Sequence, residues 1–156
     1  MNISTLTKID KPWIYRLNCQ DYIMFKKILN FKNIDFFVLN GSFMKTSDAF
    51  YDELVNKIKL PEYFGRNMNA LSECLTDSDI MQGDIFIIFI KNGDDLLVSE
   101  PNDFLESFID TLSLVADEWA TPVIDKEIWD RPAKSFHTVI CTKRGNVVLD
   151  KLPVFK

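Results

Sequence analysis

The continuous apolar run from Ile85 to Ile90 constrains the fold of this chain more than any other feature. All of its residues are isoleucine or phenylalanine, and the charged residues Asp84 and Lys91 bound it. Because the apolar residues do not alternate with polar ones, the run is typical of a central strand that is covered on both faces. It is far too short to cross a bilayer.

The elements expected around this run alternate between strands and helices. Helices are indicated by apolar residues at four-residue spacing, such as Phe50, Leu54 and Ile58, and by N-cap residues such as Asn67. This order implies an α/β fold with a small, mainly parallel sheet and right-handed crossovers. Strands are expected at 13–17, 35–39, 84–91 and 136–142, helices at 22–29, 46–60, 67–75 and 102–119, and a return hairpin at 147–149.

Length and charge limit the classes of function. A chain of 156 residues is expected to form one domain, residues 1–156, that buries its own core. The net charge is −5, and because phosphate binding needs clustered lysine and arginine, we expect no direct nucleic-acid partner. An acidic chain suits a basic protein partner instead. The N-terminal stretch lacks the apolar core of a signal peptide, and we expect no membrane partner.

The three cysteines, at positions 19, 74 and 141, do not have the spacing of a disulfide framework or of a zinc site. Reduced cysteines are typical of the cytosol, so the sequence predicts a cytoplasmic location. It leaves the oligomeric state open.

Two sets of residues could be imagined as catalytic. His137 and Cys141 would share one face of a strand, as a base and a nucleophile, or they are a chance pair with a buried cysteine. Asp84, Asp94 and Asp95 could hold a divalent metal ion, or they are the solvated ends of a strand. No glycine-rich phosphate loop is present. We therefore expect no enzyme, no cofactor and no metal.

The stretch KLPEYFGRNMNALSECL, residues 59–75, reads as a tight loop followed by a helix. On that helix Asn69, Glu73 and Asp77 are spaced at i, i+4 and i+8, opposite the apolar positions, and Tyr63 and Phe64 would project from the loop. The pattern fits a recognition patch of aromatic anchors and carboxylates. It also fits a solvated helix face whose loop aromatics pack into the core.

The same stretch resembles the barstar family, intracellular inhibitors of the secreted ribonuclease barnase. The resemblance rests on Leu60-Pro61-Glu62-Tyr63-Phe64-Gly65, Asn67, Ala70-Leu71 and Cys74-Leu75-Thr76. It extends over about residues 35–142, with an addition at 1–34, another at 121–135, and a tail or hairpin at 143–156. It implies a three-stranded parallel sheet with helices packed on it, and a loop and second helix that plug a ribonuclease active site.

Residue by residue, the resemblance implies a toxin-binding surface with altered chemistry. Glu73 stands where the family has its main aspartate, Asn69 replaces a second aspartate, and Ser72 replaces a tryptophan. Arg66 adds a positive charge. The implied partner is a basic ribonuclease toxin, and the implied contact residues are Tyr63, Phe64, Gly65, Asn67, Asn69, Glu73 and Asp77.

Other surfaces stay open at this point. A further acid of the family lies on a later helix, where Asp110, Asp117 and Glu118 are candidates. In an alternative hypothesis the toxin is bound outside its active site by aromatic residues of the N-terminal addition: Trp13, Tyr15, Tyr22 and Phe25. A third hypothesis, a small enzyme using Cys141 and His137, belongs to a different class.

Overall fold

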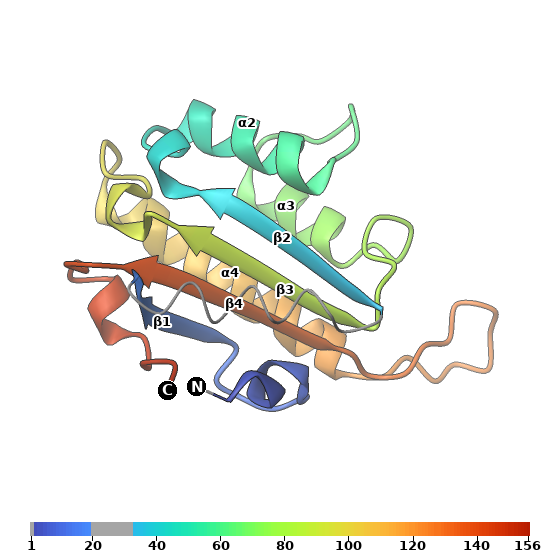
Figure 1. The fold of residues 1–156 in the computed structure, drawn as a ribbon. Helices are drawn as coiled ribbons and strands as arrows, with labels where there is room; N and C mark the ends of the chain where they lie inside the picture. Colours follow the sequence, from blue (N-terminus) through green and yellow to red (C-terminus); the bar gives the residue numbers. More distant parts are fainter. Residues whose placement is uncertain (1, 20–32) are drawn as a thin grey trace.

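One parallel sheet organises the computed structural model, which describes residues 2–19 and 33–156 (Figure 1). In these residues the sheet has four strands in the order β1-β4-β3-β2, and each neighbouring pair is parallel. The central position predicted for the apolar run is confirmed, because β3 lies between β2 and β4. The strands are β1 (Ile14–Asn18), β2 (Ile34–Asn40), β3 (Ile85–Lys91) and β4 (Ser135–Thr142).

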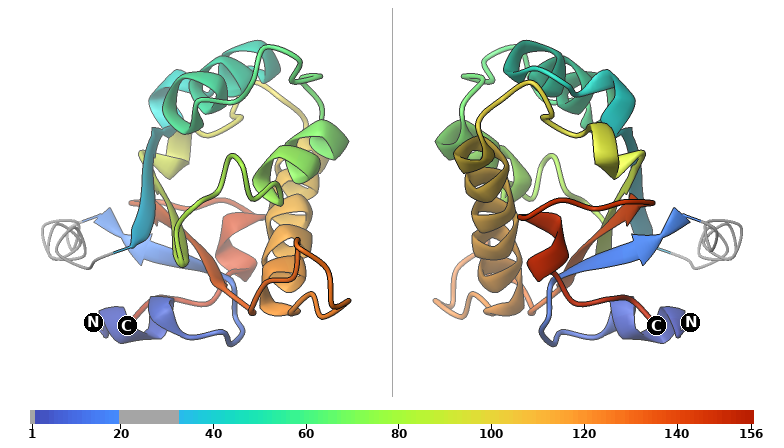
Figure 2. Two further views of the ribbon diagram at one scale, coloured as in Figure 1. Left: turned by 90° about the vertical axis from the view of Figure 1, so that its right-hand side faces the viewer. Right: turned by 90° about the vertical axis from the view of Figure 1, so that its left-hand side faces the viewer.

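The helices cover one face of this sheet (Figure 2). They are α2 (Ser47–Ile58), α3 (Met68–Leu75) and α4 (Asn102–Ala120), with α4 against β4, α2 against β2, and α3 against α4. Alternate strand residues such as Phe86, Ile88 and Ile140 join the helices in the main core. None of the helices in the described residues is long and apolar enough to cross a membrane. The helix expected at 22–29 lies outside the described residues.

The opposite face of the sheet carries a second, smaller core. Leu17, Ile87, Phe89 and Val139 point to this side and pack with Leu6. Leu6 belongs to the short 3-10 helix η1 (Ile3–Thr7), so the start of the chain helps to cover the face that the helices leave open. The alternation explains why β3 is apolar throughout: both of its faces are buried.

The expectation of a three-stranded sheet is wrong by one strand. The strand predicted at 13–17 is present as β1, and it extends the sheet by pairing with β4, with Ile14 opposite Thr138. This strand lies outside the part of the chain that resembles the family. The N-terminal addition therefore completes the sheet.

The hairpin expected at 147–149 is also wrong. The side-chain oxygen of Asn146 accepts hydrogen bonds from the backbone N–H groups of Val148 and Leu149, which starts the 3-10 helix η6 (Leu149–Lys151). The chain then continues until Val154 forms a parallel bridge with Arg16 of β1. The side chain of Asn146 thus holds the following backbone in a turn, and the chain does not return as a strand.

Cys19 and Cys141 form a disulfide, which the cysteine spacing did not predict. They are 122 residues apart in sequence, but β1 and β4 are neighbours, and Leu17 lies directly opposite Cys141. The pairing of strands from opposite ends of the chain brings the two cysteines together. Cys74 is a free, buried thiol.

Candidate functional site

The loop between α2 and α3 is held in one conformation by its own hydrogen bonds. Lys59, which ends α2, and Arg66 both have positive φ angles, 59° and 49°. The Asn67 side chain accepts from the N–H of Ala70 at 2.9 Å and donates to the carbonyl of Gly65 at 3.0 Å. The predicted N-cap thus also fixes the loop that precedes the helix.

Gly65 lies at a close approach within this loop. A Cβ atom at this position would lie 3.1 Å from the amide nitrogen of Asn67 and 3.4 Å from the Cβ of Ala70. The missing side chain lets the loop close onto the first turn of α3.

Arg66 fastens the loop to α2. Its guanidinium donates to the carboxylate of Asp52 at 2.9 Å and to the carbonyl of Asp48 at 2.9 Å, and it lies 5.7 Å from the ring centroid of Tyr51. The positive charge that the sequence places in the loop is therefore paired on the α2 side.

The loop and α3 together border a shallow hollow of about 170 Å³. The structure brings together five of the seven predicted contact residues here, while Asn67 and Asn69 lie outside the lining. Tyr63 projects as expected and is 77% exposed. The lining consists of Tyr63, Phe64, Gly65, Ala70, Glu73, Cys74 and Asp77.

Two carboxylates stand at this hollow. Glu73 is exposed and Asp77 is partly buried. Burial, together with the charges of Asp77 and Glu73, raises the pKa of the Cys74 thiol between them. Within the described residues, neither carboxylate forms an ion pair with a lysine or arginine. The hollow therefore carries negative charge that no neighbour neutralises.

Two details of the predicted surface need correction. Phe64 does not project: it is only 7% exposed and packs 5.8 Å from the ring of Tyr51, centroid to centroid. Asp77 does not continue a helical row with Asn69 and Glu73, because α3 ends at Leu75 and Thr76 caps it. Asp77 reaches the hollow from the turn that follows, where its carboxylate accepts from the N–H of Asp79 at 2.8 Å.

The end of α3 is fixed from below by α4. The indole N–H of Trp119 donates to the carbonyl of Leu75 at 2.7 Å, and both residues are fully buried. Leu71 and Cys74 bury the inner side of α3. Glu73 therefore stands on a short helix that is supported along its length.

The candidate catalytic residues are not arranged for catalysis. His137 is buried, and its ring nitrogens lie 3.0 Å from the Ser135 hydroxyl and 3.2 Å from the Asp10 carbonyl. Burial lowers the pKa of His137 below its usual value. Cys141 is bonded to Cys19 instead of lying beside this histidine.

The three aspartates considered for a metal ion do not form a cluster. Asp84 precedes β3, while Asp94 and Asp95 follow it. The full length of the strand therefore separates Asp84 from the other two. The Asp94 carboxylate accepts hydrogen bonds from the backbone N–H groups of Lys143 and Gly145. Burial acts to raise the pKa of Asp94, but these hydrogen bonds act in the opposite direction and the pKa is lowered.

The N-terminal aromatic residues divide into two groups. Trp13 and Tyr15 are each only 7% exposed and belong to the two cores, so they do not offer a binding surface. Tyr22 and Phe25 lie outside the described residues. The indole N–H of Trp13 also donates to the carboxylate of Asp117 at 2.7 Å. One of the three candidate acids of α4 is therefore already hydrogen-bonded within the protein.

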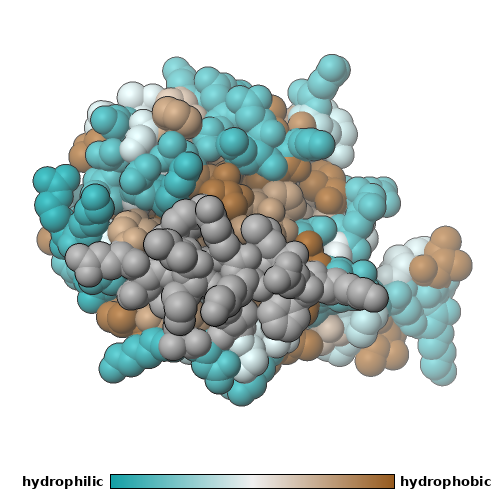
Figure 3. All heavy atoms as spheres, viewed as in Figure 1, coloured by the Kyte–Doolittle hydropathy of each residue, from teal (hydrophilic) through white to brown (hydrophobic). Residues whose placement is uncertain are grey.

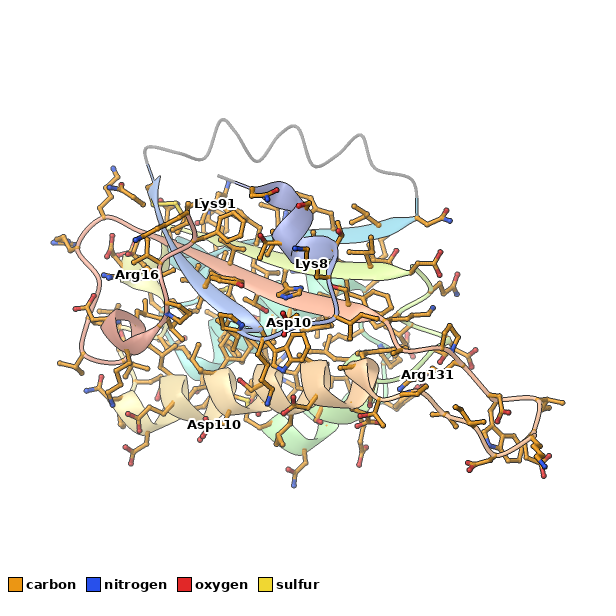
Figure 4. All side chains as sticks on the ribbon, turned by 90° about the horizontal axis from the view of Figure 1, so that it is seen from below. Lys8, Asp10, Arg16, Lys91, Asp110 and Arg131 are labelled. Carbon is orange, nitrogen blue, oxygen red and sulfur yellow. A yellow bond between two sulfur atoms is a disulfide. The ribbon has the colours of Figure 1, made fainter. Side chains whose placement is uncertain are left out.

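The other two candidate acids of α4 are exposed. Asp110 points away from the helix into solvent (Figure 4), and Glu118 lies near the end of α4. Neither lines the hollow beside α3.

One exposed apolar surface, in the segment between α4 and β4, was not predicted from the sequence. Ile128 and Trp129 are 98% and 61% exposed there. Two large apolar residues inside an otherwise polar, proline-containing segment are the signal that could have indicated it.

Comparison with known proteins gives two matches. Residues 34–140 match the family model described as Barstar (barnase inhibitor). A putative ribonuclease inhibitor, YrdF of Bacillus subtilis (strain 168), is 36% identical over 39 residues, which are 25% of this chain and 43% of that protein. The match thus spans less than half the length of this relative.

Proposed function

Because this chain belongs to the barstar family, we propose that it is an immunity protein that binds a cognate ribonuclease toxin and blocks its catalytic cleft. The family model covers more than half of the chain, and the relative named a putative ribonuclease inhibitor agrees with it. Both point to a non-enzymatic inhibitor. In this proposal the protein acts in the cytoplasm and protects a bacterium from a toxin delivered by a competitor. The support for this location is the resemblance to intracellular inhibitors, because the Cys19–Cys141 disulfide removes the argument from reduced cysteines.

One observation carries the proposal: the unpaired negative charge at the hollow beside α3. A ribonuclease cleft must be cationic, because it holds the phosphodiester of RNA. A carboxylate offered at the right depth takes the place of that phosphate and accepts charge-assisted hydrogen bonds from arginine, lysine or protonated histidine. Glu73 is the phosphate mimic in this proposal, and Asp77 stands beside it on the same lining.

The neighbouring residues have separate roles. Tyr63 is the exposed aromatic anchor, while Phe64 supports the loop from inside. Gly65 and Asn67 hold the loop against α3, and exposed Asn69 contacts the toxin beyond the hollow. Because the loop is already ordered, little conformational entropy is lost when the toxin binds.

The test is a charge-removing substitution that preserves shape. We expect Glu73→Gln to weaken binding to the cognate toxin by at least about 30-fold, the effect of losing a central contact worth about 2 kcal/mol. We expect the cognate ribonuclease to be encoded in the reading frame next to this one. The measurement is the dissociation constant for that ribonuclease, together with survival of cells that express both proteins.

Glu62→Gln is the matched control. Glu62 is exposed in the same loop but does not line the hollow, and the substitution changes the net charge equally. We expect it to change affinity by less than about threefold, as expected for a rim charge. If Glu73→Gln protects cells and binds as well as the control, the assigned contact is wrong.

A further inference from the structure

The 121–134 loop, which joins α4 to β4, exposes large apolar side chains. Ile124 is 74% exposed, Ile128 98% and Trp129 61%. The loop reaches away from the body (Figure 1), and its projecting end carries hydrophobic residues beside hydrophilic ones (Figure 3). A single exposed apolar side chain is ordinary, but three within six residues on a projecting segment indicate an interaction surface.

The loop is closed by its own hydrogen bonds. Val123 and Arg131 exchange backbone hydrogen bonds of 3.0 and 3.1 Å. At the tip, the Asp130 carboxylate accepts from the N–H groups of Asp125 and Lys126 at 2.8 and 2.9 Å. The apolar side chains are therefore presented on a preformed turn.

The base of the loop is fixed to α4 by Arg131. Its guanidinium lies 4.3 Å from the ring centroid of Trp119 and donates to the carbonyl of Glu118 at 3.2 Å. Figure 4 shows Arg131 where the loop leaves the end of the helix. The backbone N–H of Lys134 also donates to the Trp119 carbonyl at 2.8 Å.

Trp119 connects this base to the hollow beside α3. The guanidinium of Arg131 lies over the ring of Trp119. The indole N–H of the same tryptophan donates to the carbonyl of Leu75, the last residue of α3. Figure 2 shows the 121–134 loop below α3 and the segment before α3 above it, on the same side of the molecule. A protein that binds at Glu73 and extends along α3 toward the end of α4 would meet the loop.

We propose that the 121–134 loop is a second contact for the ribonuclease and places Ile128 and Trp129 in an apolar hollow outside the enzyme's cleft. This inference rests on the proposed function. Tryptophan and isoleucine on an ordered loop supply buried apolar area at small entropic cost, and tryptophan is enriched among the residues that dominate binding.

The charges around the tip favour a basic partner over a second copy of this chain. Asp125, Glu127 and Asp130 surround the apolar side chains, with Lys126 as the one cation between them. Two copies would bring these acids against a protein whose net charge is −5. A cationic ribonuclease is the complementary surface.

The test variant is Ile128→Ser combined with Trp129→Ser. The probes are a catalytically inactive form of the ribonuclease encoded in the neighbouring reading frame and, as a second enzyme, barnase. We expect the dissociation rate to rise at least about tenfold and the association rate to change less than about twofold, because the loop contacts are short-range. With the active enzyme, inhibition at saturating inhibitor stays complete, since Glu73 still fills the cleft.

Val147→Ser is the matched control, because Val147 is 65% exposed and belongs to the segment after β4, away from the 121–134 loop. Thermal unfolding verifies that the double variant is folded, and the single substitution Ile128→Ala repeats the test with a smaller change. Tryptophan fluorescence is a direct readout: Trp129 is exposed while Trp13 and Trp119 are buried, so binding shifts the parent emission to shorter wavelength and leaves Trp129→Phe unshifted.

The outcomes separate the two proposals. If the double variant binds as tightly as the parent while Glu73→Gln loses affinity, the loop contact is wrong and the proposed function stands. If the parent binds neither ribonuclease, both are wrong. If the parent is a dimer that the double variant converts to monomer, the loop binds a second copy of the chain and the inference is overturned.

Discussion

His137 is a titratable side chain that is buried inside the fold. It is the single histidine of the sequence and is fully buried between the Ser135 hydroxyl and the Asp10 carbonyl. The rings of Trp13 and Tyr15 lie 5.4 and 6.2 Å from it, centroid to centroid. A protonated imidazole at this position loses hydration that its neighbours replace only in part.

We predict that the free energy of unfolding falls as the pH drops below about 6.5, the ordinary pKa of histidine. Burial lowers the pKa of His137 in the folded protein, so in this pH range the unfolded chain binds the proton and the folded chain does not. Urea unfolding between pH 8 and pH 5 measures the effect. His137→Gln keeps hydrogen-bonding groups without the titration; an equal pH slope in that variant would assign the effect to other residues.

Single residues also show how far the sequence predicts the site. Glu73 and Asp77 were predicted to belong to one surface, and both of them line the same hollow. Their contact with a toxin stays a prediction. The sequence left open whether the loop aromatics project or pack into the core, because two adjacent aromatic residues in a loop do not reveal which one faces the core. Phe64 is buried and Tyr63 is exposed. Nor could the sequence show that the charge of Arg66 is paired with Asp52 of α2, since this contact depends on how the loop folds back.

At the scale of elements, α3 is a short helix that depends on a neighbour for its position. Its first turn is capped by Asn67, and its last carbonyl is bonded by Trp119 of α4. A helix this short is not stable alone in water, so tertiary contacts hold it in place. The placement of Glu73 therefore depends on a residue that does not touch the hollow.

We predict that Trp119→Phe lowers the free energy of unfolding by about 2 kcal/mol, because the Leu75 carbonyl is left buried without its donor. Denaturant unfolding measures the loss. Trp129→Phe makes the same chemical change at an exposed position, and we expect less than about 0.5 kcal/mol there. Similar losses in the two variants would show that the buried hydrogen bond is unimportant.

The predicted elements differ in accuracy for physical reasons. β3 and the N-cap Asn67 were found because their signals are local: a continuous apolar run, and a side chain that bonds its own helix. The pairing of β1 with β4 is not local, and the residue pattern of a strand does not predict which other strand it pairs with. The hairpin error came from reading Asn146 as part of a turn between strands, when its side chain bonds the backbone N–H groups of Val148 and Leu149 just before η6.

At the scale of the whole molecule, charge is the property that a partner meets first. The net charge is −5, and within the described residues the carboxylates beside α3 have no cationic partner. Complementary charge speeds the encounter of two proteins more than it raises their final affinity.

We predict that the association rate with the cognate ribonuclease falls about tenfold or more between about 0.05 and about 0.5 M salt, because screening shortens the range of the attraction. Stopped-flow mixing measures this rate. Glu73→Gln should show a shallower dependence than the parent, and a rate that does not respond to salt would contradict electrostatic steering.

The pairing of β1 with β4 has a consequence for synthesis in the cell. The ribosome makes β1 first, yet β1 pairs with β4, the last strand to be made, and with Val154, which follows β4. The sheet therefore cannot be completed until almost all of the described chain has been translated. If the protein has the function that we propose, copies finished before the toxin arrives give the immediate protection, and the amount already present in the cell matters more than the speed of new expression.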